Sequence, residues 1–187
     1  MESLKTQTQA IATEPMVKLC AEQQERELSK KRGPMREYKE SNTDTDILRY
    51  FDKELTPKIK HDALLQNRTI NKPRTYGPRE LDIGTIASPK DTITIFIPLT
   101  PRLSHPSDPY KLPKVMYQPD RDNKATREPM SWLIGTPVQI SGNSRIVVEE
   151  GPICFEMLQY DWLPADDPDD PEGDDPEGKG QNSAGEC

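Results

Sequence analysis

The alternating stretch from Asp91 to Thr100 constrains the fold of this chain most. Its isoleucines at 93, 95 and 97 and its leucine at 99 fall on one face only if the backbone is extended. A two-residue period of apolar and small polar side chains is typical of a strand with one covered face, and no helix would gather those four side chains. Pro98 cannot donate a ladder hydrogen bond, which predicts an edge or a bulge at this end. The stretch therefore predicts a half-covered strand.

Three stretches in the last third of the chain also read as strands. Trp132–Ile140, Ser144–Glu149 and Ile153–Tyr160 are separated by the sequences Ser-Gly-Asn-Ser and Glu-Gly-Pro. Both separators contain residues that tight turns need. Consecutive strands joined by tight turns predict a meander.

Two short helices are predicted ahead of these strands. Several possible N-caps between residues 42 and 46 precede Ile47, Phe51 and Leu55, whose i, i+4, i+8 spacing gives one apolar face. Thr56 can then cap a second helix, with Pro57 at its favoured first position, running to about residue 67. We expect this helical pair to cover one side of the sheet.

The first 43 residues have little to bury. A helix is predicted from Glu14 to Arg32, with the pair Gly33-Pro34 as its stop signal, but its middle is nearly all Glu, Gln and Arg. An isolated helix of this size is marginal in water. We interpret it as a solvated arm, the alternative being a segment that orders on a partner.

Composition limits how much of the chain can pack. Only 32% of the residues are apolar and 19 are prolines, whereas ordinary domains are about 45–50% apolar. A core of roughly 80–110 residues is expected. From Asp161 to the end, ten acidic residues and one lysine give a charge of −9, while 24 basic and 22 acidic residues leave +2 on the rest. The Asp/Glu/Pro/Gly repeats in this tail contain no apolar residue and cannot fold alone.

These features predict an α+β protein with three parts. Residues 1–43 form a flexible N-terminal arm with a marginal helix. Residues 44–163 form a single small β-rich domain, sandwich-like or a meander sheet, preceded by two short helices. Residues 164–187 form a disordered acidic tail. A protease-resistant core is expected over about 44–163, because the apolar periodicity is confined there.

Cysteine usage and hydropathy indicate an intracellular protein, cytoplasmic or nuclear. Cys20, Cys154 and Cys187 form no CxxC pair, and their odd number fits a reducing compartment better than a disulfide scaffold. No apolar run is long enough for a signal peptide or a membrane span. With only His61 and His105 to help the cysteines, no metal site and no cofactor are expected.

No catalytic motif is recognisable. The two histidines lie in a predicted helix and in a proline-rich loop with no nucleophile motif nearby, and neither GxGxxG nor GxxxxGK[ST] occurs. Paired carboxylates abound only in the tail, where a flexible backbone cannot hold them at a catalytic separation. We therefore expect a protein that is not an enzyme.

Basic residues gather in two places that could contact a polyanion. The first lies at the end of the predicted N-terminal helix, and the second lies in the connection before the first predicted strand. The candidates are Lys30, Lys31, Arg32, Arg36, Lys39, Lys72, Arg74 and Arg79. Cations near a helix C-terminus are also what the helix dipole favours, so a purely structural role is an equal alternative for the first group.

Two functions follow from this organisation. The first is a protein–protein interaction or assembly protein, whose β-domain presents an edge or a face to a partner or to another copy and whose ends are flexible arms. This plan recurs among chaperone-like, viral structural or accessory, and regulatory adaptor proteins. The second is a nucleic-acid-binding protein whose acidic tail competes for the basic residues. The first is favoured, because a body of +2 lacks the basic excess typical of nucleic-acid binding.

Overall fold

A computed structural model of the chain describes residues 14–21, 27–101 and 112–164. The residues before Glu14, the acidic tail after Pro164 and His105 lie outside the described residues, so the predictions made for them stay predictions. The elements, in chain order, are α1 (Glu14–Ala21), β1 (Leu28–Arg32), β2 (Met35–Tyr38), α2 (Asn42–Glu54), α3 (Thr56–Leu65), β3 (Arg68–Ile70), β4 (Arg74–Leu81), β5 (Gly84–Ala87), β6 (Thr92–Leu99), β7 (Lys114–Gln118), a short 3-10 helix (Lys124–Thr126), β8 (Glu128–Met130), β9 (Val138–Ser141), β10 (Arg145–Glu150) and β11 (Ile153–Pro164).

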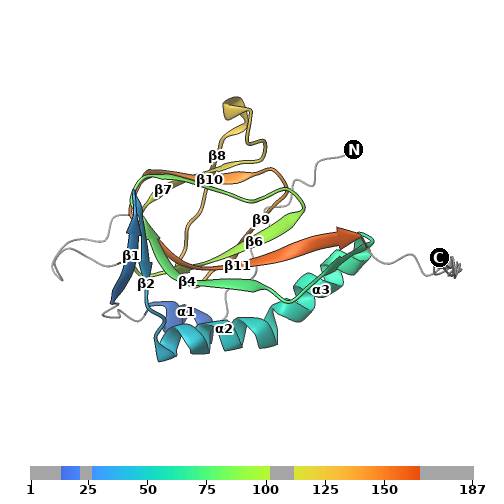
Figure 1. Ribbon diagram of the computed structural model, residues 1–187, viewed down its shortest axis with the longest axis horizontal. Coiled ribbons are helices and arrows are strands. Elements are labelled where there is room, and N and C mark those ends of the chain that lie inside the picture. The colour runs from blue at the N-terminus through green and yellow to red at the C-terminus, as the bar shows by residue number, and fades with distance from the viewer. Residues whose placement is uncertain (1–13, 22–26, 102–111, 165–187) are drawn as a thin grey trace, which may run out of the picture.

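The strands form two antiparallel sheets, with the helices against the larger one (Figure 1). The larger sheet has the order β1-β2-β4-β11-β6-β9, with β3 paired to β11, and the smaller has the order β5-β10-β7-β8. The predicted α+β, β-rich organisation is confirmed. The prediction that two short helices precede the strands is wrong, because the β1–β2 hairpin comes before α2 and α3.

The predicted meander is also wrong. β9 pairs with β6 in the larger sheet, β10 pairs with β5 and β7 in the smaller, and β11 returns to the larger sheet between β4 and β6. The tight turns reverse the chain as predicted, but each turn carries it from one sheet to the other. A turn sequence specifies the reversal and leaves the choice of pairing partner to long-range contacts.

β6 is buried on both faces, so the prediction of a half-covered strand is wrong. Its isoleucines and Leu99 lie in a cluster with Ile47, Phe51 and Leu55 from the helices, as the alternation predicts. We call this cluster the helix-side core. Phe96, on the other face, lies in a second cluster that joins residues of both sheets, where it packs edge-on against Phe155 with ring centroids 5.3 Å apart. Every residue of β6 is buried. The sheet therefore has a core on each side.

α2 and α3 form where predicted, but neither has its predicted N-cap, since the cap of α2 is Ser41, just before residues 42–46. Ser41 caps α2, and a reciprocal bond from the Ser41 backbone N–H to Asp44 completes a capping box. Pro57 lies in the first turn of α3, but Thr56 does not cap that helix, since its hydroxyl lies 3.2 Å from the Tyr160 hydroxyl. The longest helix in the described ranges, α2, has 13 residues. No helix in these ranges is long and apolar enough to cross a membrane.

The helix predicted from Glu14 to Arg32 is wrong in its second half. α1 ends at Ala21, and Leu28–Arg32 is strand β1 of a hairpin, with Gly33 at a φ of 58° in the turn. Met16 and Cys20 are buried in the helix-side core because they lie four residues apart on one face. The residues that follow offer no such face. The domain boundaries predicted at residues 43 and 163 stay a prediction, although β2 pairs with β4 of the body.

Candidate functional site

The predicted polyanion-binding residues lie on three neighbouring strands of the larger sheet and the connections beside them. Lys30, Lys31 and Arg32 are on β1, Arg36 is on β2, and Arg74 and Arg79 are on β4, while Lys39 follows β2 and Lys72 precedes β4. Strand pairing thus brings together residues from the two separate groups in the sequence. It also brings carboxylates among them, because Arg36 pairs in register with Glu80, and Glu37 pairs with Arg79.

Arg36 is held by two carboxylates of the body. Its two terminal nitrogens donate to the two oxygens of Asp82 at 2.8 Å each, and Nη1 also donates to Glu80, which is almost fully buried. The hydrogen bonds that Arg36 donates to Asp82, and secondarily to Glu80, raise its pKa above the ordinary arginine value. A fork-to-fork pair of this kind is geometrically specific. Arg36 therefore fastens β2 to β4 and is not open to a polyanion.

Arg79 and Lys39 are also paired within the fold. Arg79 Nη2 lies 3.4 Å from Glu37 Oε1, and its guanidinium carbon lies 5.0 Å from the centre of the Tyr76 ring. Lys39 Nζ donates to Glu27 Oε1 at 2.7 Å, in an exposed pair that contributes little to stability. Glu37 and Glu27 therefore neutralise two more of the predicted cations.

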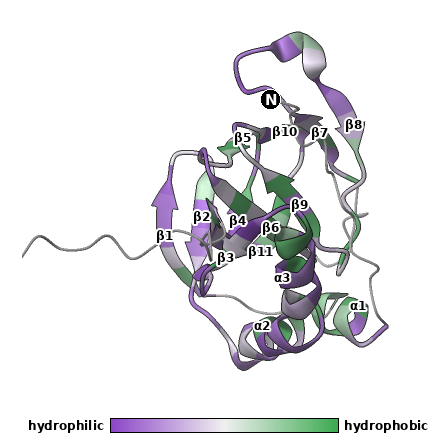
Figure 2. Cartoon of the chain, turned by 90° about the vertical axis from the view of Figure 1, so that its right-hand side faces the viewer, coloured by the Kyte–Doolittle hydropathy of each residue, from purple (hydrophilic) through white to green (hydrophobic). Residues whose placement is uncertain are grey.

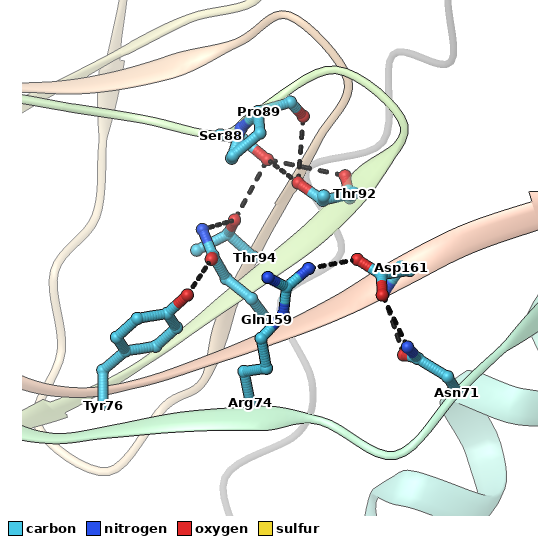
Figure 3. Close-up of polar contacts among 9 residues, drawn as sticks. All are labelled: Asn71, Arg74, Tyr76, Ser88, Pro89, Thr92, Thr94, Gln159 and Asp161. Carbon is cyan, nitrogen blue, oxygen red and sulfur yellow. Dashed lines mark hydrogen bonds and ion pairs between the residues drawn. The ribbon is translucent and has the colours of Figure 1, made fainter.

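Arg74, the first residue of β4, belongs to a polar cluster (Figure 3). Its Nη2 donates to Asp161 Oδ1 at 2.6 Å, while Asn71 Nδ2 donates to Asp161 Oδ2 at 2.6 Å. The Asp161 backbone N–H donates in return to Asn71 Oδ1 at 3.0 Å. Arg74, ahead of Asn71, holds the pKa of Asp161 below its ordinary value.

The Arg74–Asp161 pair predicts a measurable titration. Because the folded pKa of Asp161 is depressed, the pair's contribution to stability is present above the unfolded-chain pKa and is lost as the pH falls through the folded one. NMR titration of the Asp161 carboxyl carbon should give a midpoint below about 3.9, and Arg74→Gln should move it up towards that value. Lys72→Gln removes a neighbouring exposed charge and should leave the midpoint in place. An unchanged midpoint in Arg74→Gln would mean that the pair does not form in solution.

A chain of hydroxyls beside this cluster was not predicted from the sequence (Figure 3). Tyr76 donates to Gln159 Oε1 at 2.7 Å, Gln159 Nε2 donates to Thr94 Oγ1 at 3.3 Å, and Thr94 lies 3.0 Å from the Ser88 hydroxyl, which in turn lies 3.2 Å from that of Thr92. No member is a base at neutral pH. The chain therefore joins β4, β11 and β6 inside the body and has a structural role. No sequence signal could have found it, because its members come from distant segments.

A hollow of about 470 Å³ carries charges of both signs. Arg68, Asp91 and Asp120 are its charged lining residues, and Tyr117 and Trp162 are its aromatic ones. Such a mixed lining does not favour a polyanion. His61, one of the two histidines, is exposed on α3. The prediction that the protein is not an enzyme stays a prediction.

Three of the four predicted cations that have no close carboxylate partner lie together on one edge strand, and the fourth, Lys72, lies apart on the connection before β4. Within residues 14–21, 27–101 and 112–164, β1 is the outer strand of the larger sheet and pairs with β2 alone, and all five of its residues are exposed. Lys30 and Lys31 make no ion pair with any residue that the structure describes, and Arg32 has only a 3.9 Å contact to Glu37, which Arg79 shares. Figure 2 shows this strand as largely hydrophilic at the margin of the body. We call Lys30, Lys31 and Arg32 the basic edge.

The opposite margin of the larger sheet, strand β9, has no charged side chain. β9 has four residues, of which Val138 and Ile140 are fully buried in the core between the sheets. An edge strand leaves a row of backbone N–H and C=O groups unpaired, and lysines on it discourage uncontrolled pairing with other chains. In the described part of the chain, the basic edge also leaves a row of backbone N–H and C=O groups unpaired. It differs by carrying cations on both of its faces, since neighbouring side chains of a strand alternate.

Comparisons with known proteins add no assignment. No protein-family model, no curated protein and no solved structure matches this chain. Any proposal for the function of this protein therefore depends on the residues and the geometry described above.

Proposed function

We propose that this protein is a non-enzymatic, intracellular interaction protein, of the assembly or adaptor type, that binds an acidic segment of a partner protein along the basic edge. The observation that carries the proposal is the exposure of β1 on both faces, with Lys30 and Lys31 left without an ion pair among the described residues. Extended segments bind sheet edges by adding a strand, whose main-chain hydrogen bonds give affinity and whose side chains give specificity.

The chemistry of β1 indicates an acidic partner. Lys30 and Arg32 lie on one face of the strand, and Lys31 lies on the other. A strand added here would place alternate carboxylates near both faces. Charge complementarity of this kind guides encounter and sets the register more than it raises affinity.

The nucleic-acid alternative is weakened because half of its predicted contact residues pair with carboxylates of the same chain. Sequence-independent binding to phosphates depends on several cations that can each displace a counterion. Of the eight predicted residues, Arg36, Lys39, Arg74 and Arg79 are paired with carboxylates of the same chain. The four that remain include Arg32, with its long contact to Glu37, and Lys72 on a separate connection. This remainder supports a small protein-binding edge better than a phosphate-tracking surface.

Affinity capture with two matched variants tests the proposal. The edge variant is Lys30→Gln/Lys31→Gln, and the control variant is Lys60→Gln/Lys90→Gln, which removes two exposed lysines that also form no ion pair with described residues. We expect partners captured from the native source to survive nuclease treatment. Their affinity should fall about tenfold in the edge variant, since two exposed charge contacts contribute roughly 1.4 kcal/mol, and should hold in the control.

Two outcomes would contradict the proposal. Partners that vanish with nuclease would support nucleic-acid binding instead. Equal losses in the edge and control variants would show that overall charge, and not the basic edge, determines binding.

A further inference from the structure

We infer that the acidic C-terminal segment, residues 165–187, occupies the basic edge of its own molecule when no partner is bound and competes with the partner for it. The inference rests on the proposed function, because it names the regulation of the same surface. It assigns the tail an autoinhibitory role.

Charge complementarity is the first support. Residues 165–187 contain nine acidic residues and one lysine, a charge of −8. The basic edge presents three consecutive cations, two of which have no ion-pair partner among the described residues. Pro168, Pro171 and Pro176 have no N–H to donate to a ladder. The contact is therefore mainly electrostatic, and a partner segment able to add a full strand would displace it.

The length of the segment is the second support. It follows Pro164 at the end of β11, which lies at the opposite end of the body from β1 (Figure 1). Its 23 residues extend at most about 76–83 Å, whereas a compact body of this size has a radius of gyration of about 14 Å. The acidic residues can thus reach β1 around the body, and tethering gives them an effective concentration that a free peptide lacks.

A titration of the full-length protein tests the inference. The tail variant replaces Asp174 and Asp175 by Asn and Glu177 and Glu186 by Gln, which lie far enough along the segment to reach β1, and keeps the chain length. The probe is a fluorescein-labelled polyglutamate peptide, followed by anisotropy at low and high salt. We expect the tail variant to bind the probe about tenfold more tightly than the wild type at low salt. This gain should nearly disappear at about 1 M salt, where the screening length is about 3 Å.

The edge and control variants separate a specific contact from a general change of charge. Combined with the tail variant, Lys30→Gln/Lys31→Gln should remove the gain, and Lys60→Gln/Lys90→Gln should retain it. Two-dimensional proton–nitrogen NMR spectra give an independent readout. Neutralising the tail should change the amide chemical shifts of β1 and leave those of β10 unchanged.

The outcomes distinguish the two proposals. If the tail variant and the wild type bind the probe equally while the edge variant binds it less, autoinhibition is overturned and the basic edge stands. If the gain persists in the edge variant, the tail acts only through net charge, and the inference is overturned. If the combined edge and tail variant binds the probe as tightly as the tail variant does, the basic edge itself is overturned, and the inference fails with it.

Discussion

Ile95→Asp is expected to abolish the folded body. Ile95 is 1% exposed in the helix-side core and pairs in register with Leu158 of β11 and Gln139 of β9. A carboxylate there would be buried among the apolar side chains of this core, at a cost of several kcal/mol, which rivals the roughly 5–15 kcal/mol that stabilise a whole domain. Circular dichroism during thermal and urea unfolding should show no cooperative transition.

Lys58 lies near the position of Ile95, so a second variant, farther from that amine, is needed. Lys58 lines a hollow of about 110 Å³ together with Ile95, so its amine could approach an aspartate at 95. Ile97 is fully buried in the same core and pairs with the buried Glu156. Ile97→Asp should therefore unfold the body even if Ile95→Asp is partly rescued. A cooperative transition within about 1 kcal/mol of the wild type in both variants would remove β6 from the core.

Thr94 shows how the structure changes an expectation from the sequence. With one face of the strand exposed, Thr94→Asp would be mild, but Thr94 is fully buried and hydrogen-bonded to Ser88 and Gln159. We now expect Thr94→Asp to be strongly destabilising, though less so than Ile95→Asp, because hydroxyl and amide donors surround the new carboxylate. Thr85→Asp, at an exposed position of β5, is the control and should change stability by less than about 0.5 kcal/mol.

Gly135→Ala is expected to separate α1 from the body. Gly135 has a φ of +72°, and its N–H donates to the Pro98 carbonyl at 2.8 Å. A Cβ at this position would lie 2.6 Å from the Cα and 3.0 Å from the backbone nitrogen of Val17 in α1. Backbone atoms cannot rotate away as a side chain can, so α1 or the loop must move. Movement of α1 would expose Met16 and Cys20, which now lie in the core.

Gly142→Ala is the matched control for this effect. Gly142 has a similar φ of +65°, but a Cβ there meets no atom within 4 Å. Both variants carry the left-handed backbone cost of about 1–2 kcal/mol, and only Gly135→Ala adds overpacking of about 1–3 kcal/mol. Urea unfolding measures the difference, and mass spectrometry of thiol labelling should show faster modification of Cys20 in Gly135→Ala alone. Equal stability and equal labelling in the two variants would show that α1 does not pack on this loop.

Local patterns were sufficient for the elements whose evidence lies within a few residues. The spacing of Ile47, Phe51 and Leu55 predicted α2 and its buried face, and the alternation around Ile95 predicted β6 and its helix-facing side. Periods of 3.6 and 2 follow from backbone geometry alone, so any chain that buries such a face shows them. The same reasoning failed for Leu28–Arg32, because a charged edge strand buries nothing and so has no apolar period to show.

Tertiary pairing decided the site. Arg36 is separated by 46 residues from Asp82, and Arg74 by 87 residues from Asp161, so no local pattern could show that these cations are neutralised. The pairing of β2 with β4, and of β4 with β11, places the carboxylates beside them. Lys30 and Lys31 remain accessible for the complementary reason, since β1 has a neighbouring strand on one side only in the part of the chain that the structure describes. Composition supplied the cations, and strand order determined which of them stay exposed to a partner.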